Sequence, residues 1–477
     1  MEEKDKEFDA ELNTEVDRRE YRRKRRIRNQ IIGYVSVIIV FAVIITGAVI
    51  GIRTIVKGSS EKKQAEELAK QLEEMSQQEA EAPVVEPPVQ EETKTEADWL
   101  EEMVDACITE MPLEDKVAGL FMITPEALTG VDKAIKAGDG TKEALNQYAV
   151  GGLVYFKQNI QDQEQLTTML ANTASMSKYP LFLAVDEEGG KVRRVGGSSI
   201  DVPEVEDMAD IGAQGDTSKA YDAGATLASY LYELGFNVDF APDADVVTDA
   251  STSAVGKRSF GGDAAVVSDM VAAAVSGIQD TGLSACVKHF PGIGSTTADT
   301  HEGMAVIEKS NDELKASDFL PFKAGIDAGV HFVMVSHASA PNIVGDDTPC
   351  SLSGKVITDT LRGELGYNGI VITDAMNMSA VTESYSADQA AVMALQAGVD
   401  IILMPDDFKA AYEGVLAAVK DGTITEERVN ESLKRIYRIK YRDRLNQGTQ
   451  TEEAAAPDAE TDATANEEDM TPADGAR

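Results

Sequence analysis

The sequence predicts an α/β protein: a (β/α)8 TIM-type barrel forming a single folded domain, preceded by one transmembrane helix. Three observations lead to this prediction. Short apolar runs alternate eight times with longer helical stretches between about Asp98 and Asn446. Several runs are apolar at consecutive positions, as in parallel strands covered on both faces. An uncharged apolar segment precedes them all. A doubly wound open sheet is the main structural alternative.

The apolar segment Ile31–Ile52 contains 22 residues without a charge, enough for a helix that crosses a bilayer. A cationic cluster, Arg22–Arg28, precedes it, whereas only Arg53 and Lys57 follow closely. The positive-inside rule therefore puts residues 1–30 in the cytoplasm and the rest outside. A cleaved signal peptide is the alternative, but the run exceeds a usual signal-peptide core. We expect an uncleaved signal anchor in a single-pass protein of the cell membrane, in a Gram-positive bacterium.

The formal charge of −39 does not come from the folded part alone, because two segments that are poor in apolar residues are strongly acidic. Residues 61–98 carry twelve acidic side chains against four lysines, and residues 447–477 carry nine against one arginine. Such segments bury too little apolar surface to order themselves. We expect a solvated stalk over residues 53–97 and a disordered tail over residues 447–477. So acidic an exterior argues against a nucleic acid partner, and the sequence leaves the oligomeric state open.

The folded part therefore spans residues 98–446. Its predicted helices include Ser218–Glu233, Ala264–Thr281 and Ser386–Ala397, and a last helix that Thr425 caps, with Glu426 and Glu427 in its first turn. The eight predicted strands are Val117–Ile123, Gly151–Phe156, Leu181–Val185, Asn237–Ala241, Ala285–His289, His331–Ser336, Gly369–Thr373 and Asp400–Met404.

Charged and polar residues follow the ends of these strands. In a barrel such positions converge on one mouth. Acids, arginines, a lysine and histidines around a mouth suit recognition of a hydroxyl-rich ligand, and a carboxylate there can attack an anomeric carbon. The residues are Asp186–Arg194 after the third strand, Asp243, Asp245 and Arg258 after the fourth, Lys288 and His289 at the fifth, His337 after the sixth and Asp374 after the seventh.

The loop after the fifth strand is the most informative segment. Lys288–Gly294 is followed by Asp299, Thr300 and His301, so this region holds two of the chain's four histidines. The Asp-x-His spacing lets the carboxylate orient the imidazole and raise its basicity, which makes a general acid/base. Taken singly, each polar residue also has a structural explanation: Asp374 as a helix N-cap, or Arg258 paired with Asp245.

These motifs resemble glycoside hydrolase family 3, specifically its single-domain β-N-acetylhexosaminidases of the NagZ type. The resemblance runs from Met111 to about Arg438, which is essentially the whole folded region. Its most specific pieces are the segment Lys288–Gly294 with Asp299-Thr300-His301, and the segments Asp186–Arg194 and Thr373–Met378. The barrel is then a single catalytic domain.

The resemblance implies a retaining exo-β-N-acetylglucosaminidase that acts on cell-wall-derived glycans or muropeptides. Asp374 is then the nucleophile that forms a covalent glycosyl-enzyme, and His301 the acid/base polarised by Asp299. The family's sugar-binding positions correspond to Asp186, Arg194, Arg258, Lys288 and His289. The resemblance implies no metal and no organic cofactor.

Two positions depart from the family's usual residues: Ile293 stands where histidine is common, and Glu187 where glutamine is common. Ile293 removes a polar group beside the catalytic loop. Glu187 is expected to add negative charge near Asp186 and to shift ligand preference.

Other functions stay open. One is a β-glycoside phosphorylase, because a histidine acid/base does not repel phosphate, and another is a β-glucosidase. A metal-dependent barrel hydrolase would use His289, His301, His337 and Asp374 as ligands. A catalytically silent wall-binding protein is the third class, although it needs neither Asp374 nor the Asp299–His301 pair.

Overall fold

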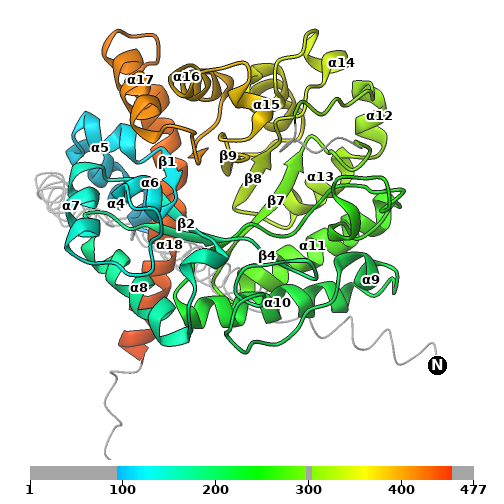
Figure 1. Ribbon diagram of the computed structural model, residues 1–477, viewed down its shortest axis with the longest axis horizontal. Coiled ribbons are helices and arrows are strands. Elements are labelled where there is room, and N and C mark those ends of the chain that lie inside the picture. The colour runs from blue at the N-terminus through cyan, green and yellow to red at the C-terminus, as the bar shows by residue number, and fades with distance from the viewer. Residues whose placement is uncertain (1–93, 297–302, 454–477) are drawn as a thin grey trace, which may run out of the picture. The chain divides into compact units, whose positions relative to one another are not determined.

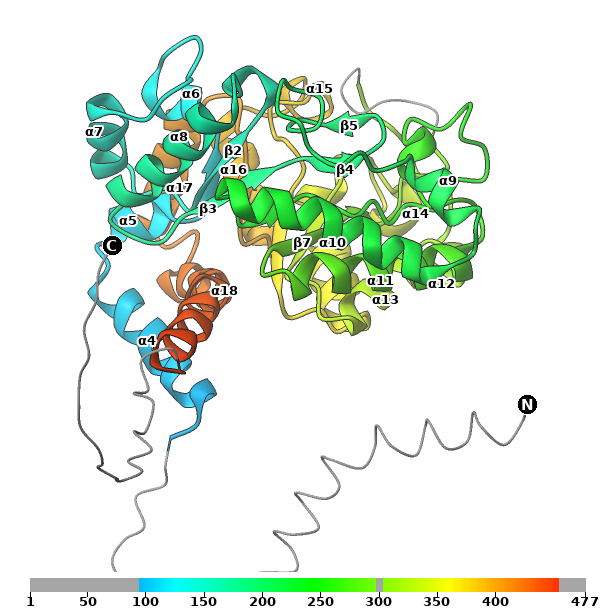
Figure 2. The same cartoon turned by 90° about the horizontal axis from the view of Figure 1, so that it is seen from below.

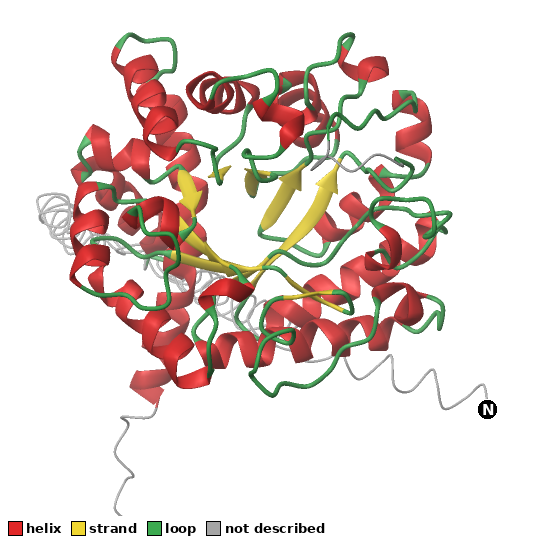
Figure 3. Ribbon diagram, in the orientation of Figure 1, coloured by secondary structure: helices red, strands yellow, loops and turns green. Residues whose placement is uncertain are grey.

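Eight parallel strands form a ring in the computed structural model, which describes residues 94–296 and 303–453, with side chains as far as Arg442 (Figures 1 and 3). The order around the ring is β10-β1-β2-β3-β6-β7-β8-β9, and a parallel bridge between Ile372 and Ile401 joins its two ends. The barrel prediction is therefore confirmed over the open sheet. The strands are β1 (Phe121–Ile123), β2 (Gly152–Tyr155), β3 (Phe182–Val185), β6 (Val238–Asp239), β7 (Ser284–Phe290), β8 (Phe332–Val335), β9 (Ile370–Thr373) and β10 (Ile402–Leu403).

Each observed strand overlaps one of the predicted apolar runs. Every residue of these strands is buried, because barrel side chains fill the centre on one face and helices cover the other. The first run is the least accurate: Val117 and Ala118 belong to the end of a short helix, α5 (Leu113–Ala118), and only Phe121–Ile123 pair as a strand.

Helical segments follow every strand and form the outer layer (Figure 1). Three of them match the predicted helices closely: α10, α11 and α16. Glycines in the left-handed conformation end two, Gly235 after α10 and Gly398 after α16, where a side chain would be strained. The segments are α6 (Pro125–Thr129), α7 (Asp139–Gln147), η1 (Lys157–Asn159), α8 (Gln163–Met176), α9 (Met208–Gly212), α10 (Thr217–Leu234), η2 (Gly256–Arg258), α11 (Ala264–Asp280), α12 (Asn311–Ala316), α13 (Phe319–Asp327), α14 (Pro341–Val344), η3 (Cys350–Leu352), η4 (Lys355–Glu364), α15 (Ser379–Thr382), α16 (Ala387–Ala397) and α17 (Phe408–Lys420).

The last helix, α18 (Glu426–Glu453), begins as predicted, because Arg428 N donates to Thr425 Oγ1 at 3.2 Å. It continues past Asn446, where the apolar pattern stops. The first described helix, α4 (Glu96–Glu110), packs against it through the ion pairs Arg438–Glu101 and Lys434–Asp105. Figure 2 shows these two helices on the side of the barrel opposite α15 and the small β4–β5 hairpin.

That antiparallel hairpin, β4 (Glu187–Gly189) with β5 (Val192–Arg193), directly follows β3 and was not predicted. Its turn needs glycine: Gly190 has φ 49°, and a Cβ there would lie 2.1 Å from Asp207 Oδ1. The hairpin lies at the barrel mouth (Figure 2).

Several predictions concern residues outside those described: the cytoplasmic segment 1–30, the transmembrane span 31–52, the stalk up to residue 93, and residues 454–477 of the tail. Within residues 94–296 and 303–453, no helix is both long and apolar enough to cross a membrane.

Candidate active site

A cavity of about 410 Å³ opens at the carboxyl ends of the strands, where a barrel carries its chemistry. Its floor consists of barrel side chains, Val154, Phe240, Met334 and Leu403. A pocket that ends on a packed barrel core is closed at the back. Around the cavity stand six of the eight predicted site residues, namely Asp186, Arg194, Arg258, Lys288, His289 and Asp374. The other two, Asp299 and His301, lie outside the described residues.

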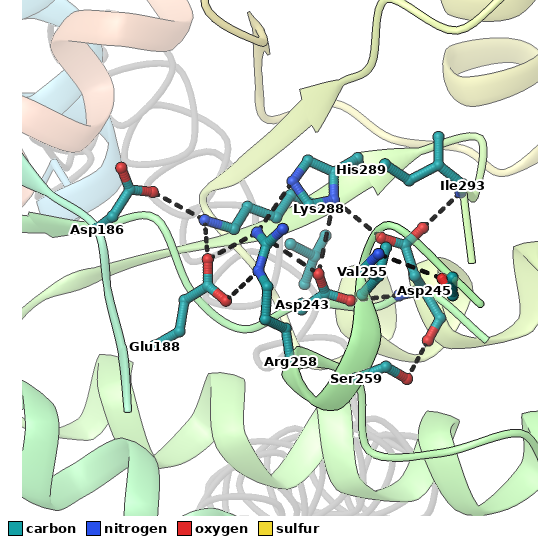
Figure 4. Close-up of polar contacts among 12 residues, drawn as sticks. Asp186, Glu188, Asp243, Asp245, Val255, Arg258, Ser259, Lys288, His289 and Ile293 are labelled. Carbon is teal, nitrogen blue, oxygen red and sulfur yellow. Dashed lines mark hydrogen bonds and ion pairs between the residues drawn. The ribbon is translucent and has the colours of Figure 1, made fainter. Parts of the chain in front are cut away.

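A buried network of ion pairs forms one wall (Figure 4). Glu188 is its centre: Arg258 donates to both carboxylate oxygens, from Nε and a terminal nitrogen, each at 2.8 Å. Lys288 Nζ lies 2.6 Å from Glu188 Oε1 and 2.9 Å from Asp186 Oδ1. Two cations and two carboxylates thus fix one another. Because a bidentate arginine–carboxylate pair is geometrically specific, the network holds these side chains in one arrangement.

Electrostatics keep Glu188, Arg258 and Lys288 charged. Burial opposes ionisation of Glu188, but the charges of Arg258 and Lys288 outweigh it and hold the pKa of the carboxyl well below its ordinary value. Burial likewise disfavours charged Lys288, yet Asp186 and Glu188 raise its pKa above the ordinary value. The pocket wall therefore offers permanent charges for charge-assisted hydrogen bonds to a polar ligand.

Arg194 reaches the same ligand space from the hairpin. Its guanidinium lies 3.5 Å from Asp186 Oδ2 and stacks over the ring of Phe156, 5.6 Å from the ring centre. Phe156 also lines the cavity, and the sequence analysis did not single it out.

The Glu187 carboxylate does not line the cavity, so the expectation that it adds charge beside Asp186 is wrong. It accepts hydrogen bonds from Val195 N (2.7 Å), Gly196 N (2.8 Å) and Tyr230 OH (2.8 Å). The reason is strand alternation: in a hairpin, Asp186 and Glu188 point one way and Glu187 the other. Glu187 therefore fixes the backbone of Val195 and Gly196, the two residues that follow Arg194.

His289 sits between the network and a second acidic group. A terminal nitrogen of Arg258 lies 3.2 Å from His289 Nε2, and His289 Nδ1 lies 2.8 Å from Asp245 Oδ2. Because arginine can only donate, Nε2 accepts and Nδ1 carries the proton given to Asp245. Burial, followed by the charge of Arg258, lowers the pKa of His289 to about 4, so the ring is neutral at pH 7. The alternative pairing of Arg258 with Asp245 is not what the structure shows.

Asp243 and Asp245 are both wholly buried behind His289. Asp245 Oδ1 also accepts from Ile293 N at 2.6 Å, which ties the loop after β7 to this carboxylate whatever side chain residue 293 bears. Burial and the neighbouring Asp245 raise the pKa of Asp243 to about 8, and burial raises that of Asp245 to about 7. The pair therefore holds a proton at neutral pH.

We expect Asp243→Asn to raise the melting temperature at pH 8.5 by about 5 °C and to change it little at pH 4. The folded state keeps a proton on Asp243 up to about pH 8, whereas the unfolded chain loses it near pH 3.8, so wild-type stability falls between these values. The amide removes this loss. Melting curves across pH 4–9 test the expectation, with the exposed Asp269→Asn as control. A lower melting temperature at pH 8.5 contradicts it.

Asp374 follows β9, two strands along the ring from β7, and lines the cavity. Ala375 N donates to its Oδ1 at 2.7 Å. Burial opposes its ionisation, but His289, His337, this hydrogen bond and Lys288 together lower its pKa below the ordinary value. Met378, not Asp374, caps the following helix, so the N-cap explanation fails. An ionised carboxylate at the pocket wall is placed to act as a nucleophile.

His337 supports the loop that carries Asp374. Its Nε2 lies 3.0 Å from the carbonyl oxygen of Ala375, and its Nδ1 lies 2.7 Å from Ser351 Oγ. Both ring nitrogens are thus engaged with protein atoms, which argues against His337 as a ligand in the alternative metal site.

Within the described residues, the group with metal-ligand spacing is Asp243, Asp245 and His289. A terminal nitrogen of Arg258 lies 3.7 Å from Asp243 Oδ2 and 3.2 Å from His289 Nε2. A guanidinium already provides the positive charge at this position. The arrangement fits an acidic pair that balances Arg258 better than a cation site.

Three further cavity residues were given no role in the sequence analysis, Glu188, Asn377 and Met404, although the first two lie within the motif segments named there. Glu188 could have been found from the alternation Asp186–Glu187–Glu188, once Gly189-Gly190 is interpreted as a hairpin turn. Met404 has φ 46°, which is strained for a side chain other than glycine and typical of functional sites. Sequence pattern gives no signal for it.

Comparison with known proteins agrees with this geometry. Residues 112–439 match the glycosyl hydrolase family 3 N terminal domain. The chain is 32% identical to Beta-hexosaminidase A of Pseudoalteromonas piscicida over 327 residues, 62% of this chain and 54% of that protein. It is 35% identical to Beta-hexosaminidase of Stenotrophomonas maltophilia (strain K279a) over 266 residues, 55% of this chain and 78% of that protein.

Among solved structures, the chain is similar to a glycoside hydrolase family 3 beta-N-acetylglucosaminidase from Paenibacillus sp. str. FPU-7. The two are 34% identical with a TM-score of 0.66, over 74% of this chain and 65% of that one. The chain thus spans about half to two thirds of two of these relatives and a larger share of the third. The match runs from the residue before α5 into α18 and includes every described site residue, so the chain belongs to glycosyl hydrolase family 3.

Proposed function

We propose that the protein is a retaining exo-β-N-acetylglucosaminidase that removes terminal non-reducing N-acetylglucosamine from cell-wall-derived glycans. One observation carries this proposal: ionised Asp374 and the network of Asp186, Glu188, Arg258 and Lys288 line the same blind cavity. A closed pocket accepts a chain end, which supports exo action. Its volume of about 410 Å³ lies in the range of small-molecule sites.

In the proposed reaction, Asp374 attacks the anomeric carbon and the bond to the leaving oxygen breaks, giving a covalent glycosyl-enzyme. His301, polarised by Asp299, gives a proton to the leaving oxygen and later takes one from water. The water oxygen then displaces Asp374 and restores the starting configuration. The charged network holds the sugar hydroxyls while this happens.

Hydrolysis is favoured over phosphorolysis by the state of the described cations. Lys288 contacts Asp186 and Glu188, Arg258 contacts Glu188, and Arg194 contacts Asp186. The three described cations of the cavity are matched in number by three carboxylates, Asp186, Glu188 and Asp374, which leaves little attraction for a phosphate dianion. Sugar 1-phosphate formed in phosphate buffer would favour the phosphorylase instead.

The proposal is tested by turnover of a chromogenic N-acetyl-β-glucosaminide beside the matching β-glucoside. Selective release from the N-acetyl substrate is expected. Preference for the glucoside keeps the mechanism but changes the substrate to that of a β-glucosidase. No release from either favours a silent wall-binding protein.

His301→Ala is expected to slow natural disaccharides at least about tenfold more than substrates with a nitrophenolate leaving group. A nitrophenolate departs without protonation, whereas a sugar alkoxide needs the acid. Values of kcat/KM for both substrates in wild type and variant decide the matter. Equal losses on the two substrates rule out His301 as the acid.

The proposed location is the cell membrane, with one helix over residues 31–52, a cytoplasmic N-terminus and the barrel outside. The uncharged run and the cationic residues before it support this location. Protease added to intact cells is expected to degrade the barrel; a barrel that stays protected until lysis contradicts the orientation.

A further inference from the structure

The barrel mouth contains a second hollow besides the Asp374 pocket. It has a volume of about 570 Å³ and lies among the connections that follow β7, β8 and β9, on the same side of the barrel as the pocket. Its lining residues after β7 are Met304 and Val306, those after β8 are Ser339, Asp346, Asp347 and Thr348, and those after β9 are Ser384 and Tyr385.

The connection after β9 links the hollow to the pocket. Met378 lines the pocket and precedes α15, while Ser384 and Tyr385, just beyond α15, line the hollow. The amides of Ser384 and Tyr385 both donate to Val381 O, which folds this end compactly. Only the short helix α15 and the turn after it separate Met378 from Ser384 and Tyr385, so one compact segment contributes to both the pocket and the hollow.

Another part of the lining is fixed by pairing between the loops after β7 and β8. Val306 and Ser339 form a parallel bridge. Ile307 N donates to Ser339 O, and Ser339 N donates to Ala305 O, each at 2.8 Å. The hollow therefore has a defined wall on this side.

The lining suits a carbohydrate. Val306 is 39% exposed and Tyr385 half-buried, which gives an apolar and aromatic surface for the C–H face of a sugar. Ser339 is wholly buried, and its Oγ has no hydrogen-bond partner among the described residues, so it can bond a ligand hydroxyl.

Charge selects which carbohydrate fits. Asp346 and Asp347 are exposed at the hollow, and no lysine or arginine lines it among the described residues. Hydrogen bonds from Thr348 keep the pKa of Asp346 below its ordinary value, so this carboxylate stays charged in mildly acidic conditions. Carboxylates attract hydroxyl and amine donors and repel a ligand carboxylate.

We propose that this hollow is a subsite for the leaving group, which binds the second and third sugar units of a substrate when they are uncharged or amine-bearing and discriminates against carboxylate-bearing units. The inference rests on the proposed glycosidase function and deepens it. Among cell-wall-derived glycans, it makes those whose leaving-group sugars are neutral or de-N-acetylated better substrates than fragments with free acid groups.

The test compares kcat/KM of the full-length protein on the β-1,4-linked trimer and dimer of N-acetylglucosamine, on N-acetylglucosaminyl-N-acetylmuramic acid, and on the nitrophenyl glycoside. We expect kcat/KM to be higher for the trimer than for the dimer. At low salt, kcat/KM for the acidic disaccharide should be about fivefold lower than for the dimer. The double variant Asp346→Asn/Asp347→Asn should remove most of this difference in kcat/KM between the acidic disaccharide and the dimer. Its kcat/KM on the nitrophenyl substrate should stay within about twofold of the wild-type value. Salt of about 1 M should shrink the deficit in wild type, because screening weakens exposed charges.

The matched control removes two exposed carboxylates elsewhere, Glu143→Gln/Asp269→Asn, and should change no ratio. Tyr385→Ala should raise KM for the trimer more than for the nitrophenyl substrate. If neither the double variant nor salt changes the ratio of kcat/KM between the dimer and the acidic disaccharide, the proposed subsite is wrong. Continued turnover of the nitrophenyl substrate would still support the proposed glycosidase function. Loss of nitrophenyl turnover in wild type overturns both.

Discussion

Replacing Asp374 with alanine is expected to lower kcat on the nitrophenyl N-acetyl-β-glucosaminide by about 10⁴-fold or more, with the barrel still folded. The carboxylate is held ionised and is bonded to Ala375 N at 2.7 Å. Its other contacts are mainly electrostatic, so its loss leaves the strand pairing of β9 intact. Steady-state kinetics beside a melting curve separate the two effects.

Azide supplies the control for this prediction. In Asp374→Ala, azide can enter the space of the lost carboxylate and attack the anomeric carbon from the same face, while nitrophenolate departs with the bonding electrons. The product expected is the α-glycosyl azide. Asp374→Asn should be equally inactive without azide, because an amide is a poor nucleophile. More than about 1% residual activity in both variants would remove Asp374 from the nucleophile's role.

Glu188→Gln is expected to cost about 3–5 kcal/mol of stability and about 100-fold in kcat/KM. The substitution keeps the shape of the side chain but leaves buried Lys288 and part-buried Arg258 with one carboxylate fewer. Both cations then move toward other acids, and the sugar-binding geometry moves with them. Denaturant unfolding at pH 7 and kinetics on the same preparation measure the two losses.

The pH dependence of this loss has a definite sign. The pKa of Glu188 is below its ordinary value of 4.5 in the folded state, so its stabilisation is present above that value and declines as pH falls below it. The gap between wild type and Glu188→Gln should therefore narrow in acid. Glu204→Gln, which removes an exposed partner of Arg193, is the control and should cost under about 1 kcal/mol. A gap that is constant with pH contradicts the electrostatic explanation.

The barrel could be predicted because its strands must be apolar on both faces. The run Leu181–Val185 needs no tertiary information to be recognised as a buried parallel strand. Residues at strand ends share one mouth whatever the exact strand bounds, which is why Asp186, Lys288 and Asp374 were identified together.

What could not be predicted is which acid pairs with which base. Arg258 follows Asp245 by thirteen positions, yet it binds Glu188, because the β4–β5 hairpin brings that carboxylate across the mouth. The protonation state of Asp243 likewise depends on its complete burial, which the composition of the chain does not reveal. Periodicity locates elements, but charge pairing across a mouth requires the positions of several loops at once.

The pairing of α4 with α18 has a consequence for how such an enzyme can be held at a surface. Both helices lie on the side of the barrel away from the β4–β5 hairpin and α15 (Figure 2). A tether that leaves the barrel from either helix therefore starts behind it. If the proposed membrane segment serves as that tether, glycan ends reach the pocket from the side of the barrel away from the attachment.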